Sequence, residues 1–211
     1  MQPRVSSTLT RPQTIADAAI RIIARDGLRA LTHRSTDREA GLPPGSCSYY
    51  AGTRAALIQL VGQRLAERSM ADLHRFFDNV ARIEPISDPD GRLRQLARVI
   101  ADFADSLLAR PADMRARYAL AMDFLEADPL SDLLSAQSPL LADSFSRAPD
   151  LLRRFGIAAT PAHGRDIMLL TDALTFSRTL HASSPQLQLD VEGVVLSHLR
   201  SLPTGAVSDD A

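Results

Sequence analysis

The chain has 211 residues, of which 45% are hydrophobic and 23% are charged, and its formal net charge is −1. This composition is ordinary for a globular protein, and the length allows one or two domains with a sizeable core. No apolar run reaches the ~18 residues of a membrane-spanning helix, and the N-terminus has no long apolar stretch of the secretory type, so we expect no membrane partner. The single cysteine, Cys47, excludes an intramolecular disulfide and suits the reducing cytoplasm, where we expect the protein to be located.

Charge is distributed unevenly along the chain. Residues 1–70 contain ten arginines and five acidic residues, a balance of +5, so the remaining residues carry −6. A polyanionic partner is therefore expected at the N-terminal end, unless the clustering is accidental. The sequence contains no lysine, so every cationic contact to a phosphate must come from an arginine guanidinium.

The first predicted helix follows an arm of residues 1–9. Thr10 and Gln13 have the spacing of a capping box, and Gly27 follows the last residue of the helical pattern, Asp26. Apolar residues then recur at helical spacing. They are Ile15, Ala18, Ala19, Ile22 and Ile23.

Three helix-start signals then follow one another closely. Thr32 can cap a short helix that ends at Gly41, Pro44 can open a second short helix over residues 44–51, and Thr53 can cap a third, long one. Two short helices joined by a tight turn fit a helix-turn-helix, whose second helix enters the DNA major groove. The alternative is a polar loop between two ordinary helices, because short segments bounded by Gly and Pro are common.

Residues 12–60 resemble the DNA-binding domain of the TetR family of bacterial transcriptional regulators. The resemblance rests on Ile15, Ala18, Ala19, Gly27, Leu31, Thr32, Ala40, Gly41, Leu42, Gly45, Ser46, Arg54 and Leu57. It implies a repressor that binds a pseudo-palindromic double-stranded DNA operator as a homodimer and is released by a small-molecule effector. The expected DNA-contacting residues are Thr32, His33, Arg34, Pro44, Gly45, Ser46, Ser48, Tyr49, Tyr50 and Arg54.

The sequence departs from the family pattern at a few positions of this domain. Thr36 and Asp37 replace a hydrophobic residue and an alanine, and Ser48 replaces a tyrosine. The Thr36 hydroxyl can donate to the carbonyl of residue 32, which makes that change tolerable. Ala51 replaces a phenylalanine, a loss of ~3–5 kcal/mol unless a neighbour fills the space, and we expect Tyr50 to fill part of it. If these changes abolish DNA binding, the protein is instead a helical dimeric protein-interaction module with a degenerate DNA reader.

The rest of the chain is also predicted to be helical. A long helix over residues 53–82 would act as a lever from the DNA reader, and residues 83–91 would form a loop. Further helices are expected over residues 92–109, 112–127, 130–154 with an interruption at Pro139, 161–182 and 191–202. We therefore predict an all-α protein of about nine helices. Its expected parts are a three-helix helix-turn-helix domain (residues 1–60), a helical effector-binding and dimerisation domain (61–203) and a flexible tail (204–211).

The last two predicted helices are too apolar for one subunit to cover, which predicts a four-helix dimer interface. The expected interface residues are Leu170, Leu174, Arg178, Val191, Val195 and Leu199. The middle helices could enclose an unidentified small-molecule effector in an apolar cavity, although such residues at helical spacing are more often core. The candidates are Phe103, Leu107, Met114, Tyr118, Met122, Phe145, Met168, Asp172 and Phe176.

No catalytic motif is recognisable. The sequence has no nucleophile elbow, no phosphate-binding or dinucleotide glycine pattern and no C-x-x-C, and its five histidines lack metal-ligand spacing. We therefore expect no enzyme, no catalytic residue, no cofactor and no metal site.

Overall fold

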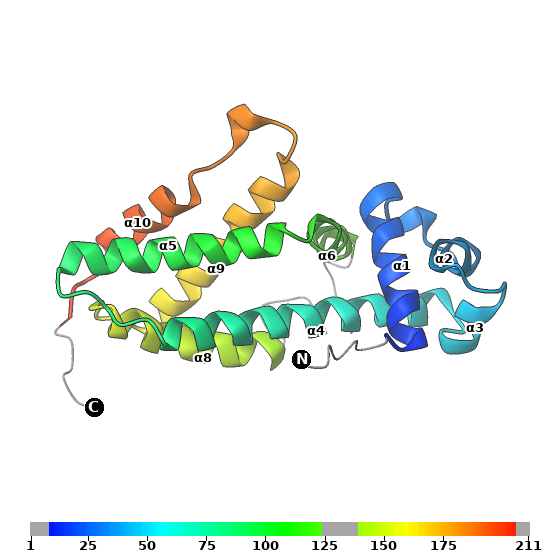
Figure 1. The fold of residues 1–211 in the computed structure, drawn as a ribbon, viewed down its shortest axis with the longest axis horizontal. Helices are drawn as coiled ribbons and strands as arrows, with labels where there is room; N and C mark the ends of the chain where they lie inside the picture. The colour runs from blue at the N-terminus through cyan, green and yellow to red at the C-terminus, as the bar shows by residue number, and fades with distance from the viewer. Residues whose placement is uncertain (1–8, 124–138, 206–211) are drawn as a thin grey trace, which may run out of the picture.

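The computed structural model describes residues 9–123 and 139–205, and within these ranges the chain is all-α, as predicted, with nine α-helices and two short 3₁₀ turns. Helices α1, α2 and α3 gather at one end, and α4 runs from them along most of the molecule (Figure 1). The elements are α1 (Arg11–Asp26), η1 (Leu28–Ala30), α2 (His33–Ala40), α3 (Ser46–Tyr50), α4 (Arg54–Ala81), α5 (Pro89–Leu108), α6 (Pro111–Asp123), α8 (Pro139–Arg154), α9 (Pro161–Leu180), η2 (Pro185–Leu187) and α10 (Val191–Ser201).

The predicted capping residues begin the helices of the N-terminal end. Thr10 caps α1 in a capping box with Gln13, and the Thr53 hydroxyl accepts a hydrogen bond from the backbone nitrogen of Ala56 at 3.1 Å. Three starts differ from the prediction: α3 begins at residue 46 because 44 and 45 form a turn, α5 begins at residue 89 because Asp88 caps it, and α6 begins one residue early, at residue 111. Part of the helices predicted over 112–127 and 130–154 lies outside the described residues.

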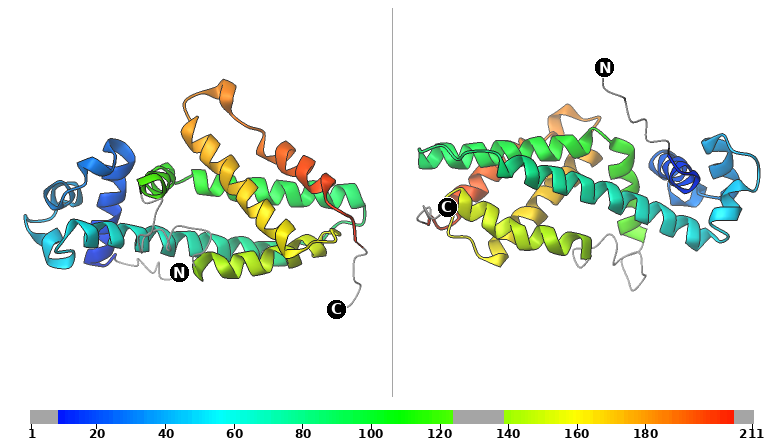
Figure 2. Two further views of the ribbon diagram at one scale, coloured as in Figure 1. Left: turned by 180° about the vertical axis from the view of Figure 1, so that it is seen from behind. Right: turned by 60° about the horizontal axis from the view of Figure 1, so that its bottom comes forward.

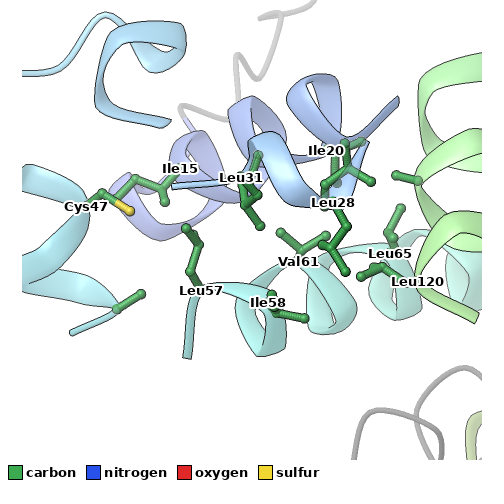
Figure 3. Close-up of a cluster of buried hydrophobic side chains, with 14 residues drawn as sticks. Ile15, Ile20, Leu28, Leu31, Cys47, Leu57, Ile58, Val61, Leu65 and Leu120 are labelled. Atoms are coloured by element: carbon green, nitrogen blue, oxygen red, sulfur yellow. The ribbon is translucent and has the colours of Figure 1, made fainter. Parts of the chain in front are cut away.

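One hydrophobic core joins α1, α3 and the first half of α4 to α6. Ile15, Leu31 and Leu57 are fully buried at its centre, and Leu120 of α6 closes it (Figure 3). Val61 and Leu65 of α4 belong to the same cluster. Packing is therefore continuous across residue 60, where the sequence predicts the domain boundary.

A second core joins α5, α8, α9 and α10. Phe155 is its largest fully buried side chain, and α10 packs chiefly against α5 (Figure 2). The residues predicted to face a second subunit belong to this core: Leu174, Val191, Val195 and Leu199 are at most 5% exposed within one chain. Arg178 pairs with Asp105 of α5, and Leu170 packs against the core. For Leu174, Val191, Val195 and Leu199 the predicted contact with a second subunit is wrong, because α5 covers the apolar stripe of α10 and part of that of α9. For Leu170 and Arg178, which are partly exposed, it remains a prediction.

The start of the predicted tail is held against the body. Thr204 pairs with Ile157, and the backbone nitrogen of Gly205 donates to the carbonyl of Gly156 at 3.0 Å. Residues 206–211 of the predicted flexible tail lie outside the described residues. Within the described ranges, every helix is too short or too polar to cross a lipid bilayer.

A chain of ion pairs ties α1 and α6 to α4. Asp17 of α1 accepts hydrogen bonds from Arg64 at 2.9 Å and from Arg68 at 2.6 Å. Arg68 also donates to Asp113 of α6 at 2.7 Å, and Arg110 lies 3.3 Å from the second oxygen of Asp113. Because the Asp113 side chain is only 7% exposed, its charge needs these partners. Helices α1 and α6 are thus connected to α4 by ion pairs as well as by apolar contacts.

We predict that Arg68→Met destabilises the fold. The substitution removes the shared partner of Asp17 and the buried Asp113, and removing one partner of a buried pair costs about 3 kcal/mol, the lower end of the usual range because Arg64 and Arg110 remain. Urea denaturation would measure the change in the free energy of unfolding. Arg94→Met, on α5, is the control, because Arg94 is 59% exposed and its partner Asp90 is 43% exposed, so its loss should cost about 0–1 kcal/mol. Equal effects of both substitutions would contradict a structural role for the ion-pair chain.

Candidate functional site

The helix-turn-helix predicted from the sequence is present at residues 33–50. Gly41 ends α2 with a φ of 65°, and its backbone nitrogen lies within hydrogen-bonding distance of the carbonyls of Asp37 and Arg38. Gly45 precedes α3 with a φ of 91°. Both φ values lie in the left-handed region that glycine adopts at least cost, so the two glycines give the turn its shape.

Asp37 fixes the second short helix onto the first. Its side chain belongs to α2 and is buried, with the residue only 5% exposed. One carboxylate oxygen accepts from the backbone nitrogen of Gly45 and the other from that of Cys47, each at 2.7 Å. Gly45 has no side chain with which to cap α3, and a five-residue helix is marginal alone. Asp37 therefore supplies the N-terminal cap of α3 from the neighbouring helix.

The departure at Thr36 is accommodated as the sequence predicts. Its side chain is fully buried, and its hydroxyl donates to the Thr32 carbonyl at 2.8 Å. Thr32 in turn caps α2 by accepting from the backbone nitrogen of Ser35 at 3.0 Å. Thr36 and Asp37, the two residues of α2 that depart from the family pattern, thus have their polar side-chain atoms hydrogen-bonded within the helix-turn-helix.

The expectation for Ala51 is wrong in one respect. Ala51 is buried in the N-terminal core, but Tyr50 is 45% exposed and does not fill the space of the absent phenylalanine. The ring of Tyr50 instead stands edge-on to that of Tyr49, with the centroids 5.0 Å apart. The Ala51 carbonyl lies 2.5 Å from Nε2 of His33, a contact that ties the end of α3 to the start of α2.

Most of the residues predicted to contact DNA are exposed. Tyr49 is 84% exposed, while His33 and Ser46 are half-buried. The Ser46 hydroxyl donates to the Pro43 carbonyl at 2.7 Å. The exposed members are Thr32, Arg34, Pro44, Gly45, Ser48, Tyr49, Tyr50 and Arg54.

The arginines of the N-terminal end fall into two groups. Arg21 and Arg25 bind Glu39, and hydrogen bonding from Arg21, with a smaller contribution from Arg25, lowers the pKa of that carboxyl group. A second group is exposed and, within the described part of the chain, pairs with no acid: Arg11, Arg29, Arg34 and Arg38. Arg54 is also exposed, but it donates to the carbonyl of Leu28 at 2.8 Å. Three of these four unpaired arginines, at positions 29, 34 and 38, lie on or next to the short helix α2 in the sequence.

Cys47 of α3 is a core residue of the helix-turn-helix. Its side chain is fully buried, and burial, with a smaller effect of the Asp37 charge, raises the pKa of the thiol to about 11. The thiol therefore stays protonated at neutral pH, which argues against a redox role.

A cavity of about 160 Å³ lies between α4, α5, α6, α8 and α9. Five of the nine predicted effector-binding residues line it: Phe103, Leu107, Phe145, Met168 and Asp172. Sequence reasoning missed the α4 side of the lining, because Phe76 and Phe77 fit the apolar stripe of a long core helix equally well. The lining also includes Ser69, Leu73, Ile100, Arg117, Ala148, Leu151, Leu152, Ile167, Leu169, Thr171 and Thr175.

The other four predicted residues lie outside the cavity lining. Met114 is 3% exposed and belongs to the packed interior, whereas Met122 is 60% exposed on the surface of α6. Tyr118 and Phe176 pack edge to face, with ring centroids 4.8 Å apart. Burial, reinforced by the nearby Asp172 charge, raises the pKa of the Tyr118 hydroxyl, which therefore remains a neutral donor to Asp172 at 3.2 Å.

Solved structures that resemble this chain are TetR-family transcriptional regulators, in agreement with the resemblance of residues 12–60. A TetR-family member from Streptomyces coelicolor is 25% identical with a TM-score of 0.60, and the match covers 93% of this chain and 100% of that one. The multidrug-binding protein EbrR, solved with imidazole, is 24% identical with a TM-score of 0.59 and coverage of 96% and 100%. NalD, the secondary repressor of the MexAB-OprM multidrug efflux pump in Pseudomonas aeruginosa, is 16% identical with a TM-score of 0.59 and coverage of 92% and 95%. Neither a protein-family model nor a curated protein matches the chain.

We predict that Asp37→Ala destabilises the N-terminal end by about 2–3 kcal/mol, because two backbone N–H groups lose a charged acceptor. Thermal and urea unfolding would measure the loss. Asp37→Asn keeps one acceptor oxygen and should lie between the wild type and the alanine variant. Glu39→Ala, two residues further along α2, removes only pairs with the exposed Arg21 and Arg25 and should cost about 0–1 kcal/mol. An alanine variant as stable as Glu39→Ala would show that Asp37 does not hold α3.

Proposed function

We propose that the protein is a transcriptional regulator that binds a pseudo-palindromic DNA operator as a homodimer and is released from it by a small-molecule effector. The observation that carries this proposal is the exposed outer side of α2 and α3, which combines hydroxyl and phenol groups with arginines that are not neutralised. The fold shared with TetR-family regulators supports it.

The proposed contacts divide into two kinds. Phosphates would be bound by guanidinium and hydroxyl groups such as those of Arg34 and Thr32, which set the register of the protein on the duplex. Base edges would be read by Ser48, Tyr49 and Tyr50 of α3 in the major groove. The Asp37 carboxylate would not repel the phosphates strongly, because it is buried and hydrogen-bonded to the backbone of α3.

Dimerisation would use the exposed side of α9 and not the side predicted from sequence. Leu169, Ala173, Phe176 and Leu180 recur at intervals of four, three and four residues, and Leu169 and Leu180 are 48% and 65% exposed. Val194 adds an apolar side chain from α10 that is 36% exposed. Packing these helices against a second copy would place two α3 helices about one DNA turn apart, ~34–36 Å.

The alternative function is a helical dimer that binds another protein through a reader unable to bind DNA. The exposed pair Tyr49 and Tyr50 favours this reading, because phenols are also frequent in protein interfaces. The salt dependence of binding separates the two functions, since release of DNA counterions makes affinity fall steeply with salt.

We predict that Arg34→Ala weakens binding to DNA from the upstream region of the gene and reduces the salt slope of the affinity by about one. Tyr49→Phe removes one hydroxyl and should weaken specific binding by about 1 kcal/mol with little change in slope. Fluorescence anisotropy across a salt series, with excess unrelated DNA as competitor, measures both quantities.

Arg165→Ala is the control for these substitutions. Arg165 is 59% exposed on α9, far along the chain from the reader, and its removal also takes away one positive charge. If all three variants bind like the wild type, α2 and α3 do not read the operator.

We predict that Leu180→Arg shifts the protein from dimer to monomer, because it would bury a charge at the most exposed residue of the apolar stripe, at the C-terminal end of α9. Analytical ultracentrifugation measures the mass in solution. Ile86→Arg is the control, since Ile86 is 46% exposed in the loop between α4 and α5. A dimer that persists in the Leu180 variant would place the interface elsewhere.

A further inference from the structure

The cavity between α4 and α9 combines an aromatic wall with a partly buried cation. Phe76, Phe77, Phe103 and Phe145 give it an apolar interior, and among the described residues its charged lining consists of Arg117 and Asp172. Arg117 would favour an anionic ligand and Asp172 a cationic one. The interactions that each group already makes in the protein therefore decide which ligand charge the cavity favours.

Arg117 is poorly satisfied within the protein. Its side chain is only 18% exposed, yet its closest carboxylate oxygen, on Asp172, is 3.8 Å away and its contact to the Ser69 hydroxyl is 3.4 Å long. Close guanidinium–carboxylate pairs are ~2.7–2.9 Å, and Arg68 reaches its two partners at 2.6 and 2.7 Å. A partly buried cation with such long contacts would gain from an anion placed at closer range.

Asp172 is the better satisfied of the two groups. Its side chain is 52% exposed, so water solvates much of its charge, and one of its oxygens accepts from the Tyr118 hydroxyl at 3.2 Å. A cationic ligand would therefore replace interactions that Asp172 already has, whereas an anionic ligand would give Arg117 a partner that it lacks.

We propose that the effector is a small aromatic carboxylate, with its ring among the four phenylalanines and its carboxylate on Arg117 and Ser69. This inference rests on the proposed function in assigning the cavity to the effector. The volume of about 160 Å³ supports a ligand with a single ring, because a cavity of ~150 Å³ holds benzene. Arg117 is then the residue that determines specificity for an anion.

The position of Arg117 links this ligand to the reader. It lies on α6, next to Ala116, which is fully buried in the core shared with α1. A carboxylate that takes Arg117 away from Asp172 would loosen the contact between α6 and α9, and α6 would carry any displacement to α1.

Isothermal titration of the full chain with three ligands of similar shape tests the charge preference. Phenylacetate is the anion, phenylacetamide is the neutral counterpart and phenethylamine is the cation. We expect phenylacetate to bind at least about 10-fold more tightly than the other two, as a charge-assisted pair implies. Arg117→Met keeps most of the side-chain volume and should weaken phenylacetate binding about 10- to 100-fold, without changing the affinity for phenylacetamide.

Two variants serve as controls. Arg115→Met removes an exposed charge from the same helix, two residues before Arg117, and should leave phenylacetate binding unchanged. Asp172→Asn should tighten it, because a competing acceptor of Arg117 and a negative charge in the cavity lining are lost. Circular dichroism melts establish that each variant is folded.

Several outcomes would overturn the proposal. Tighter binding of phenethylamine would show that the cavity prefers cations, bound through Asp172. Equal binding of the three ligands would show that the cavity selects only for apolar shape. If none of the three binds, one-ring ligands are excluded. Operator binding, measured separately, distinguishes failure of the regulator function from failure of this ligand assignment. If phenylacetate binding depends on Arg117 but the protein does not bind DNA, the ligand site is supported and the proposed function as a DNA-binding regulator is contradicted.

Discussion

The helix-turn-helix depends on one buried carboxylate. Without Asp37, the N-terminal N–H groups of α3 would have no side-chain acceptor, because the capping position is Gly45. Glycine is needed there for its left-handed φ, so the residue that shapes the turn cannot also cap the helix. Placing the acceptor on α2 resolves this conflict and makes the geometry of α3 depend on its packing against α2. A carboxylate at the N-terminus of a helix is also favoured by the helix dipole, which offsets part of the cost of its burial.

The same arrangement shows how far the sequence determines the structure and where it falls short. Helix starts at Thr10, Thr32 and Thr53 were predictable, because a capping residue acts on backbone groups only two or three positions away. Asp37 instead accepts from backbone groups eight and ten residues away, across a turn. Local sequence patterns do not detect such a contact, so from the sequence Asp37 is recognisable only as a departure from the family pattern. The available signal was indirect: a helix that begins after glycine needs an acceptor from elsewhere, and Asp37 is an acid of the preceding helix.

Faces of helices were harder to predict than the helices themselves. The apolar stripe of α10 was correctly identified, but periodicity does not say which neighbour covers it, and α5 of the same chain does so. The effector cavity shows the same limit: Phe103, Leu107 and Phe145 line it, whereas Met114 is core and Met122 is surface. Spacing reports that a side chain is apolar and faces inward; only the packing of distant segments separates core, cavity and interface.

Helix α6 lies where the two halves of the molecule meet, and this position limits how an effector could act. One side of α6 is held against α1 by buried Ala116 and Leu120, and Asp113 of α6 pairs with Arg68 of α4, while Arg117 faces the cavity. A closely packed helix moves as a rigid body, so a displacement of α6 at Arg117 would be transmitted directly to α1, which α6 contacts. An effector changes DNA affinity, however, only if it binds the two positions of α6 unequally. The long contact between Arg117 and Asp172 offers a basis for such a difference, since an anion that takes Arg117 away from Asp172 removes a contact between α6 and α9.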